Sequence, residues 1–151
     1  MPISIENAKA GDVEALVKLL NILFSIEQDF SPDETAQRHG LQLLLDTPEQ
    51  GQIFVARDKD AGVVGMVSAQ LVISTAMGAP SAWIEDMVVR EAFRGLGVGN
   101  ALLEKAKEWA ATKGARRLQL VADADNPAAL EFYKHLDWQP TRLFAWKKII
   151  S

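Results

Sequence analysis

The chain has 151 residues, of which 48% are hydrophobic and 24% are charged, and its formal net charge is -4. This length and composition predict a single globular domain over residues 1–151. The acidic balance argues against a protein that coats a nucleic acid, because such binding depends on many Lys and Arg contacts with phosphates. The sequence contains no cysteine, which excludes disulfides, thiolate metal sites and a cysteine nucleophile.

The N-terminal residues lack the basic and apolar regions of a signal peptide. Residues 63–84 carry no charge over a length that can span a bilayer. Gly78, Pro80 and several Ser, Thr and Gln residues interrupt this stretch, so it predicts two buried strands and a turn rather than a membrane helix. We therefore expect a cytoplasmic protein whose partners include neither a membrane nor a nucleic acid, and the lack of cysteine fits a reducing compartment.

The first half of the chain predicts a strand, two helices and a hairpin. Apolar residues recur at helical spacing from Val13 to Phe24, and Val and Ile runs on either side of an Asp- and Gly-containing turn are typical of a hairpin. In chain order, we expect a strand at Ile3–Ile5, a helix capped by Asp12, a helix that begins at Pro32, and a hairpin of residues 53–56 and 63–67 around the turn 58–62.

The second half alternates strands with helices. In chain order, we expect a strand at Trp83–Val89, a helix from Val98 to a stop at Lys113–Gly114, a strand at Leu118–Ala122, a helix capped by Asn126 that runs through Leu136, and a strand at Leu143–Ile150. A strand–helix–strand unit forms a right-handed parallel crossover, whereas strands joined by short turns are antiparallel. The predicted class is therefore α/β with a mixed sheet, in which mostly antiparallel N-terminal strands adjoin a central parallel β-α-β unit.

A loop rich in glycine follows the strand at Trp83–Val89. Arg94, Gly95, Gly97 and Gly99 lie between this strand and the next helix. Glycines let the main chain approach a ligand closely, and the unpaired amides at a helix N-terminus attract an anion. Arg94 adds a permanent cation that bonds phosphate oxygens in pairs. The loop is therefore expected to hold the phosphate of a ligand.

Several phosphate-bearing ligands compete for this loop. A nucleoside triphosphate loop needs Lys followed by Ser or Thr after its last glycine, whereas Gly99 is followed by Asn and Ala. A dinucleotide loop needs a third glycine where this chain has Leu102. The remaining interpretations are an Arg-x-x-Gly-x-Gly motif formed by Arg94, Gly97 and Gly99, and a glycine-rich turn that binds nothing.

The Arg-x-x-Gly-x-Gly motif resembles the loop with which the GNAT superfamily of N-acetyltransferases holds the pyrophosphate of acetyl-CoA. The stretch Trp83–Val89 is similar to the strand before that loop, and Asn126–Trp138 is similar to the family's last helix, including its Phe-Tyr pair. Asp137 departs from the pattern, because a glycine commonly stands there, and this bears on a turn rather than on chemistry. The resemblance implies an acyl-CoA N-acyltransferase fold, one N-acetyltransferase domain, and acetyl-CoA as cosubstrate.

The resemblance also implies which residues bind the cofactor. The pyrophosphate is expected at the amides of the loop, and the pantetheine arm is expected to bond like an extra strand along the strand before it. Asn126 is a suitable helix cap by its residue type, and the resemblance implies that it also contacts the cofactor. The implied cofactor-binding residues are Met87, Val88, Val89, Arg94, Gly95, Leu96, Gly97, Val98, Gly99, Asn100, Asn126 and Tyr133.

Tyr133 and Glu85 carry the implied catalysis. Tyr133 is expected to donate a proton or a hydrogen bond to the departing thiolate, the alternative being a core tyrosine that packs beside Phe132. Glu85 is expected to act as the base, through water, that keeps the attacking amine neutral, the alternative being an ordinary surface carboxylate. Asp86, which strand alternation places on the opposite face, is the second choice. A backbone amide near Val88 is expected to polarise the thioester carbonyl.

The loop between the first two helices is acidic and borders the acceptor site in the resembled family. Its acidic residues are Glu27, Asp29, Asp33 and Glu34. Such runs are most often solvated surfaces. The Glu85–Asp86 pair and the short chain are similar to those of diamine and polyamine acetyltransferases, so a small cationic amine is a hypothesis for the acceptor, with Glu27, Asp29 and Glu85 as its binding residues.

The sequence thus predicts an enzyme that moves an acetyl group from acetyl-CoA to a primary amine by direct attack in a ternary complex. No metal is expected, because His39 and His135 are isolated in sequence. Members of the resembled family often form dimers, so a homodimer is among the expected partners. The alternatives are a non-catalytic acyl-CoA-binding regulatory module, an acetyltransferase of protein or peptide amines, and a mononucleotide-binding protein.

Overall fold

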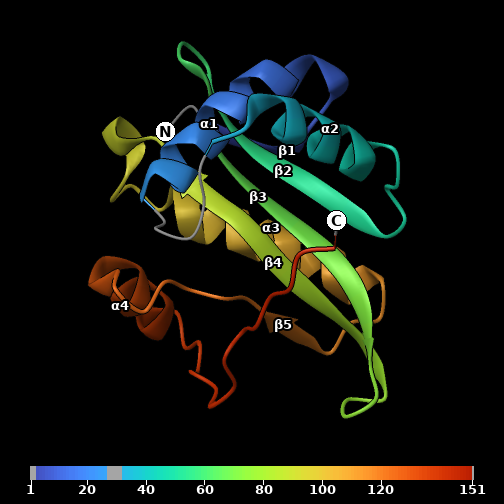
Figure 1. Cartoon of the computed structure of the whole chain (residues 1–151). Coiled ribbons are helices and arrows are strands. Elements are labelled where there is room, and N and C mark those ends of the chain that lie inside the picture. The colour runs from blue at the N-terminus through green and yellow to red at the C-terminus, as the bar shows by residue number, and fades with distance from the viewer. Residues whose placement is uncertain (1–2, 27–31, 151) are drawn as a thin grey trace. The chain divides into compact units, whose positions relative to one another are not determined.

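The computed structural model describes residues 3–26 and 32–150. The chain divides into two compact units, Met1–Leu120 and Val121–Ser151, which are described separately below. The first unit contains a twisted sheet with helices α1 and α2 on one face and helix α3 on the other (Figure 1). The second unit contains helix α4.

The described elements follow the predicted order through α4. They are β1 (Ile3–Asn7), the short 3-10 helix η1 (Ala10–Asp12), α1 (Val13–Ile26), α2 (Glu34–Leu45), β2 (Gly51–Asp58), β3 (Gly62–Ser74), β4 (Ala79–Val89), the 3-10 helix η2 (Glu91–Phe93), α3 (Val98–Thr112), β5 (Arg117–Gln119) and α4 (Pro127–His135).

The five strands form one sheet in the order β1-β2-β3-β4-β5. Neighbouring strands from β1 to β4 are antiparallel, and β4 and β5 are parallel and joined through α3. The mixed sheet predicted from the sequence is therefore confirmed, as is its division into an antiparallel N-terminal part and a parallel β-α-β unit.

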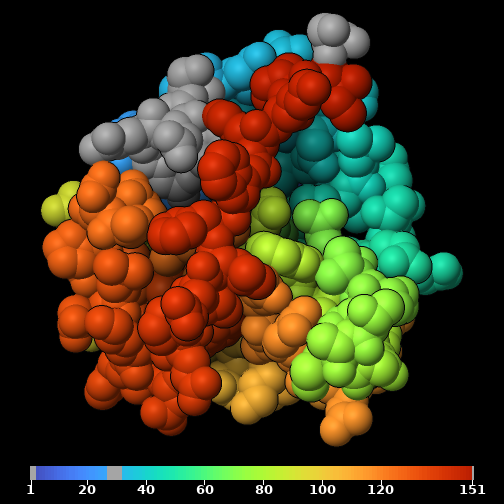
Figure 2. All heavy atoms as spheres, turned by 60° about the horizontal axis from the view of Figure 1, so that its bottom comes forward, coloured from blue at the N-terminus to red at the C-terminus, as the bar shows by residue number. Residues whose placement is uncertain are grey.

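The core of the first unit lies on both faces of β2 and β3. Leu16 of α1, Phe54 of β2 and Leu102 of α3 are almost completely buried. Gly65 of β3 permits the close approach of α3, because a Cβ atom there would lie 3.2 Å from Leu102 Cδ1 and 3.3 Å from the carbonyl oxygen of Val88. The far end of the β3–β4 hairpin extends beyond this core (Figure 1), and its yellow-green residues form a surface knob in Figure 2.

Two helix starts differ from prediction. Asp12 lies in η1, where its carboxylate accepts hydrogen bonds from the Lys9 N–H at 2.9 Å and from Arg57 Nη2 at 3.1 Å. The hydrogen bond with Asp12 raises the pKa of Arg57. The second helix is capped by Asp33, whose Oδ1 accepts from the Ala36 N–H at 3.1 Å, so it begins one residue after this cap rather than at Pro32.

The predicted C-terminal strand is absent. Residues 143–150 form no strand in the structure, and β5 is shorter than predicted, ending at Gln119. Leu143, Phe144 and Trp146 are 81%, 85% and 94% exposed. An apolar run predicts a strand, but only a partner edge with matching hydrogen bonds forms one, and residues 143–150 pair with no strand among those described.

Helices α3 and α4 end in the same hydrogen-bonding pattern with different residues at its left-handed position. Gly114 has a φ of 83° and Asp137 a φ of 68°. Each helix end has two reverse bonds of 3.0 Å, from Gly114 to Ala111 and Ala115 to Ala110 after α3, and from Asp137 to Lys134 and Trp138 to Tyr133 after α4. This is a Schellman motif, in which glycine is the favoured residue. Asp137 therefore bears on a turn, as its departure from the family pattern predicts.

We expect Asp137→Gly to raise the free energy of unfolding by up to about 1 kcal/mol, because glycine adopts a left-handed conformation without the Cβ clash. Gly114→Asp is the matched control, and it is expected to lower the same quantity by about 1 kcal/mol. A Cβ at Gly114 would meet nothing within 4 Å, so its effect reports the backbone conformation. Chemical denaturation of both variants checks this pair, and shifts of the same sign would contradict it.

Candidate active site

The centre of the site is an irregularity in β4. Met66 of β3 faces Val88, but Ser68 faces Glu85, so Asp86 and Met87 together oppose one residue of β3. Asp86 has a φ of 52°, a left-handed conformation that a side chain disfavours. The buried Ser68 hydroxyl donates a 3.1 Å hydrogen bond to the carbonyl oxygen of Glu85. These features define a β-bulge, a device that commonly redirects side chains beside active sites.

Two adjacent acidic residues at the bulge line one groove. An open groove of about 530 Å³ lies between β4 and helices α1 and α2, and both Glu85 and Asp86 line it. Strand alternation predicts that Asp86 takes the face opposite to Glu85. The bulge inserts a residue here and interrupts the alternation on which that prediction rests.

The wall opposite β4 is built by α1 and α2. Its apolar part includes Leu20 and Phe24 of α1 and Leu41 of α2, and its polar part includes Asp33 and Gln37. Gln37 is 7% exposed although it lies on a helix rich in polar residues. Gln37 was not predicted from the sequence, since its burial arises from packing against α1 and leaves no signal in the spacing of apolar residues.

The edge of β4 that follows the bulge is open toward β5. Pairing between β4 and β5 covers Ser81–Trp83, and from Ile84 to Val89 no pairing with β5 is present among the described residues. Met87, Val88 and Val89 lie in this stretch, with Val88 buried. The main chain of these residues is thus positioned at a strand edge, where an extended amide-containing arm can form ladder hydrogen bonds.

The glycine loop joins this edge to α3. Arg94 Nε donates a 2.8 Å hydrogen bond to the carbonyl oxygen of Val89, which fastens the loop to the end of β4. Gly95 and Gly97 have φ values of 76° and 83°, so both positions require the conformational freedom of glycine. Leu96, between them, is 52% exposed.

The N-terminus of α3 presents its first amides at this loop. Gly97 is the N-cap, and its carbonyl oxygen accepts the first helical bond, from the Ala101 N–H at 3.0 Å. The amides of Val98, Gly99 and Asn100 therefore precede the bonded part of the helix. Together with the helix dipole, such amides form an anion-binding end.

Two of the predicted site residues, Asn126 and Tyr133, lie in the second unit. Asn126 Oδ1 accepts a 3.2 Å hydrogen bond from the Ala129 N–H, so Asn126 caps α4 as predicted. The Tyr133 ring makes edge-to-face contacts with Phe132 at 5.3 Å and with Trp138 at 5.8 Å between ring centroids. The tyrosine ring thus packs against two aromatic neighbours, one in α4 and one just after it.

Two predicted acceptor residues, Glu27 and Asp29, lie outside the described residues. Within the described part of the chain, no group of three or more His, Asp and Glu side chains has the arrangement of a metal site. No helix among the same residues has the length and hydropathy to cross a membrane.

The comparisons with known proteins agree with this fold. The model of the acetyltransferase (GNAT) family matches residues 15–138. An uncharacterized N-acetyltransferase of Methanocaldococcus jannaschii is 36% identical over 69 residues, which cover 45% of this chain and 30% of that protein. The chain therefore aligns with about a third of the length of that curated relative.

Two solved structures are similar over nearly their whole length. A transcriptional regulator from Bacillus halodurans has a TM-score of 0.83 and 25% identity, over 97% of this chain and 99% of that one. Glucosamine-6-phosphate N-acetyltransferase from Arabidopsis thaliana has a TM-score of 0.78 and 16% identity, over 99% of this chain and 100% of that one. At this identity the similarity is one of fold alone.

The fold and the glycine loop define an acyltransferase-like protein with a strand edge and a helix N-terminus at its centre. The match to the family model covers most of the chain and runs through both units. This chain belongs to the acetyltransferase (GNAT) family.

Proposed function

We propose that the chain is an acetyl-CoA-dependent N-acetyltransferase that acts on a primary amine. Its single strongest support is the bulged β4, whose open edge leads into the glycine loop and the first amides of α3. The edge offers amide pairing to pantetheine, and the loop offers donors to a pyrophosphate. Coenzyme A is a ligand that carries both groups in this order.

The proposed binding residues follow from these parts. The main chains of Met87, Val88 and Val89 pair with the pantetheine arm, and a backbone amide near Val88 polarises the thioester carbonyl. The pyrophosphate lies at the residues from Arg94 to Asn100. For Asn126 and Tyr133 the support is the family membership together with the cap and ring contacts within their own unit.

The reaction is a direct transfer. The lone pair of a neutral amine forms a C–N bond with the thioester carbonyl carbon, the C–S bond breaks, the nitrogen loses a proton, and the thiolate gains one. Glu85, through a water molecule, accepts the proton of the amine, and Tyr133 donates to the thiolate. The acceptor occupies the groove lined by Glu85 and Asp86, whose carboxylates favour a small cationic amine.

Calorimetry with acetyl-CoA and with ATP tests the donor, and release of free CoA thiol across a panel of amines tests the reaction. We expect micromolar binding of acetyl-CoA and no comparable binding of ATP. Gly97→Val is expected to weaken acetyl-CoA binding about tenfold or more, because a β-branched residue strains the left-handed cap. Gly62→Val, at φ 78° in the β2–β3 turn, is the matched control and is expected to leave the affinity unchanged. Binding of ATP in place of acetyl-CoA would overturn the proposal.

A second candidate is a regulatory module that binds acyl-CoA without turnover. The solved transcriptional regulator from Bacillus halodurans favours it, since its structure is similar over almost the whole of both chains. Acetyl-CoA binding without CoA release, for every small amine and for peptides with free N-termini or lysines, would select this candidate.

A further inference from the structure

The amide of Gln37 is buried in the wall of the groove with one polar atom unpaired. Gln37 lines the groove and is 7% exposed. Its Nε2 donates a 3.1 Å hydrogen bond to Asn21 Oδ1. Its Oε1 has no hydrogen-bond partner among the described residues. A buried amide oxygen in this state is costly, and such atoms in native proteins usually meet water or a ligand.

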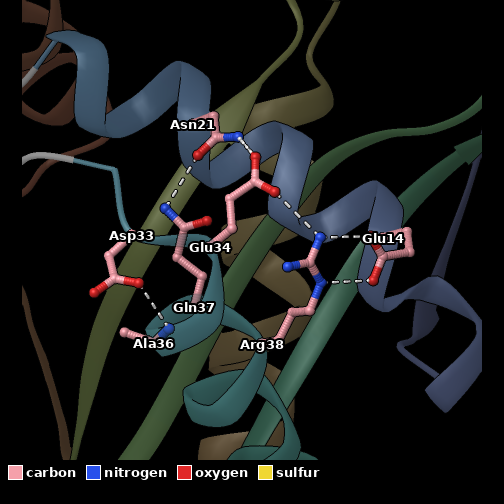
Figure 3. A network of polar contacts seen from close by, with 7 residues as sticks. All are labelled: Glu14, Asn21, Asp33, Glu34, Ala36, Gln37 and Arg38. Carbon is pink, nitrogen blue, oxygen red and sulfur yellow. Dashed lines mark hydrogen bonds and ion pairs between the residues drawn. The ribbon is translucent and has the colours of Figure 1, made fainter.

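The orientation of this amide follows from its neighbours, which Figure 3 shows. Arg38 donates two 2.9 Å hydrogen bonds to Glu14 and one of 3.2 Å to Glu34 Oε1. Glu34 Oε2 accepts a 2.9 Å bond from Asn21 Nδ2. Because an ionised carboxylate only accepts hydrogen bonds, Asn21 must turn its amide nitrogen to Glu34 and its oxygen to Gln37. Gln37 must then donate to Asn21, which leaves Oε1 as the open end.

The far end of this chain of hydrogen bonds is an ion pair between Arg38 and Glu14. The hydrogen bond from Arg38 lowers the pKa of Glu14, and the same bond raises the pKa of Arg38. Both groups therefore stay charged throughout the neutral range. Because the Glu34 carboxylate accepts hydrogen bonds from both Arg38 and Asn21, the Asn21 and Gln37 amides cannot reverse together, and the unpaired atom of Gln37 is an acceptor rather than a donor.

We propose that Gln37 determines acceptor specificity: its Oε1 takes a hydrogen bond from an N–H or O–H group of the substrate, away from the nitrogen that is acetylated. The proposal rests on the proposed function for the reaction itself. Glu85, the proposed base, lines the groove from β4, and Gln37 lines it from α2. The substrate class is therefore an amine with a second hydrogen-bond donor, on an apolar body that contacts residues such as Leu20 and Leu41.

The test compares ω-amino alcohols of three to six carbons with their O-methyl ethers, which keep the oxygen but lose the donor. We expect kcat/KM for the best amino alcohol to exceed that of its ether about tenfold, as for one hydrogen bond in a buried site. Gln37→Met keeps the length of the side chain without its amide, and it is expected to bring this ratio close to one.

A second variant and a matched control separate specificity from folding. Asn21→Ala retains Gln37 but removes the partner of its Nε2, and it is expected to reduce the ratio in part. Gln42→Met changes a glutamine of the same helix that bonds Asp46 at an exposed position, and it is expected to leave the ratio unchanged. Circular dichroism of each variant checks that the fold is retained.

Binding without turnover gives an independent readout. The side-chain amide signals of Gln37, assigned by their loss in Gln37→Met, are expected to shift on addition of an amino alcohol and to shift less with its ether. If no amino alcohol binds better than its ether, or if Gln37→Met retains the preference, the assignment is wrong. Calorimetry with acetyl-CoA on the same samples tests the proposed function separately, because Gln37 lies outside the proposed cofactor site.

Discussion

Tyr133→Phe is expected to lower kcat about 10²–10⁴-fold while the affinity for acetyl-CoA stays nearly constant. The substitution keeps the ring, and with it the edge contacts to Phe132 and Trp138. It removes only the hydroxyl that we propose as the donor to the departing thiolate. Single-turnover kinetics with saturating amine measure the effect on chemistry, and calorimetry measures acetyl-CoA binding.

The size of this loss depends on how the hydroxyl acts. An ordinary tyrosine is a weaker acid than an ordinary thiol by about 1.5 pKa units, so complete proton transfer before C–S cleavage is uphill by about 2 kcal/mol. A hydrogen bond that strengthens as charge develops on sulfur avoids this cost. Phe132→Leu is the control, since it loosens the ring packing without removing a donor, and a modest effect is expected. Unchanged turnover in Tyr133→Phe would remove Tyr133 from the mechanism.

Glu85→Gln is expected to lower kcat/KM for alkylamines about 100-fold at neutral pH, with a smaller loss, about tenfold, for Asp86→Asn. Both residues line the groove, so the pair forms a matched test of which carboxylate is the base. An alkylamine is mostly protonated at neutral pH, and the base is needed to expose its lone pair. The defect of Glu85→Gln should therefore shrink as the pH approaches the amine's own pKa, about 10.

The division of the effect between kcat and KM distinguishes a base from a residue that merely binds the cation. If Glu85 only attracts the ammonium group, Glu85→Gln raises KM and leaves kcat nearly unchanged at saturating amine, whereas the loss of a base lowers kcat. The opposite order of the two variants, with Asp86→Asn the more damaging, would assign the base to Asp86.

The C-terminal segment shows where sequence reasoning failed. The pattern of residues 143–150 predicts a strand just as strongly as the pattern of residues 53–56 does. Only residues 53–56, however, pair with a neighbouring strand on each side. Strand formation depends on hydrogen bonds to another segment, and the pattern of one segment carries no information on whether an edge is available. The helix ends were better predicted because their bonds are local, as at Asn126 and Gly114.

The sequence by itself determined the parts of this protein that depend on neighbouring residues. The loop from Arg94 to Gly99, the helix that follows it and the mixed sheet could be predicted because glycine conformations, helix caps and apolar spacing are local properties. Only the tertiary structure decided that Asp86 joins Glu85 in one groove and that the Gln37 amide is buried with a fixed orientation. A bulge depends on the register between two strands, and a buried amide depends on the charges packed around it, so neither could be seen in the spacing of residues along the chain.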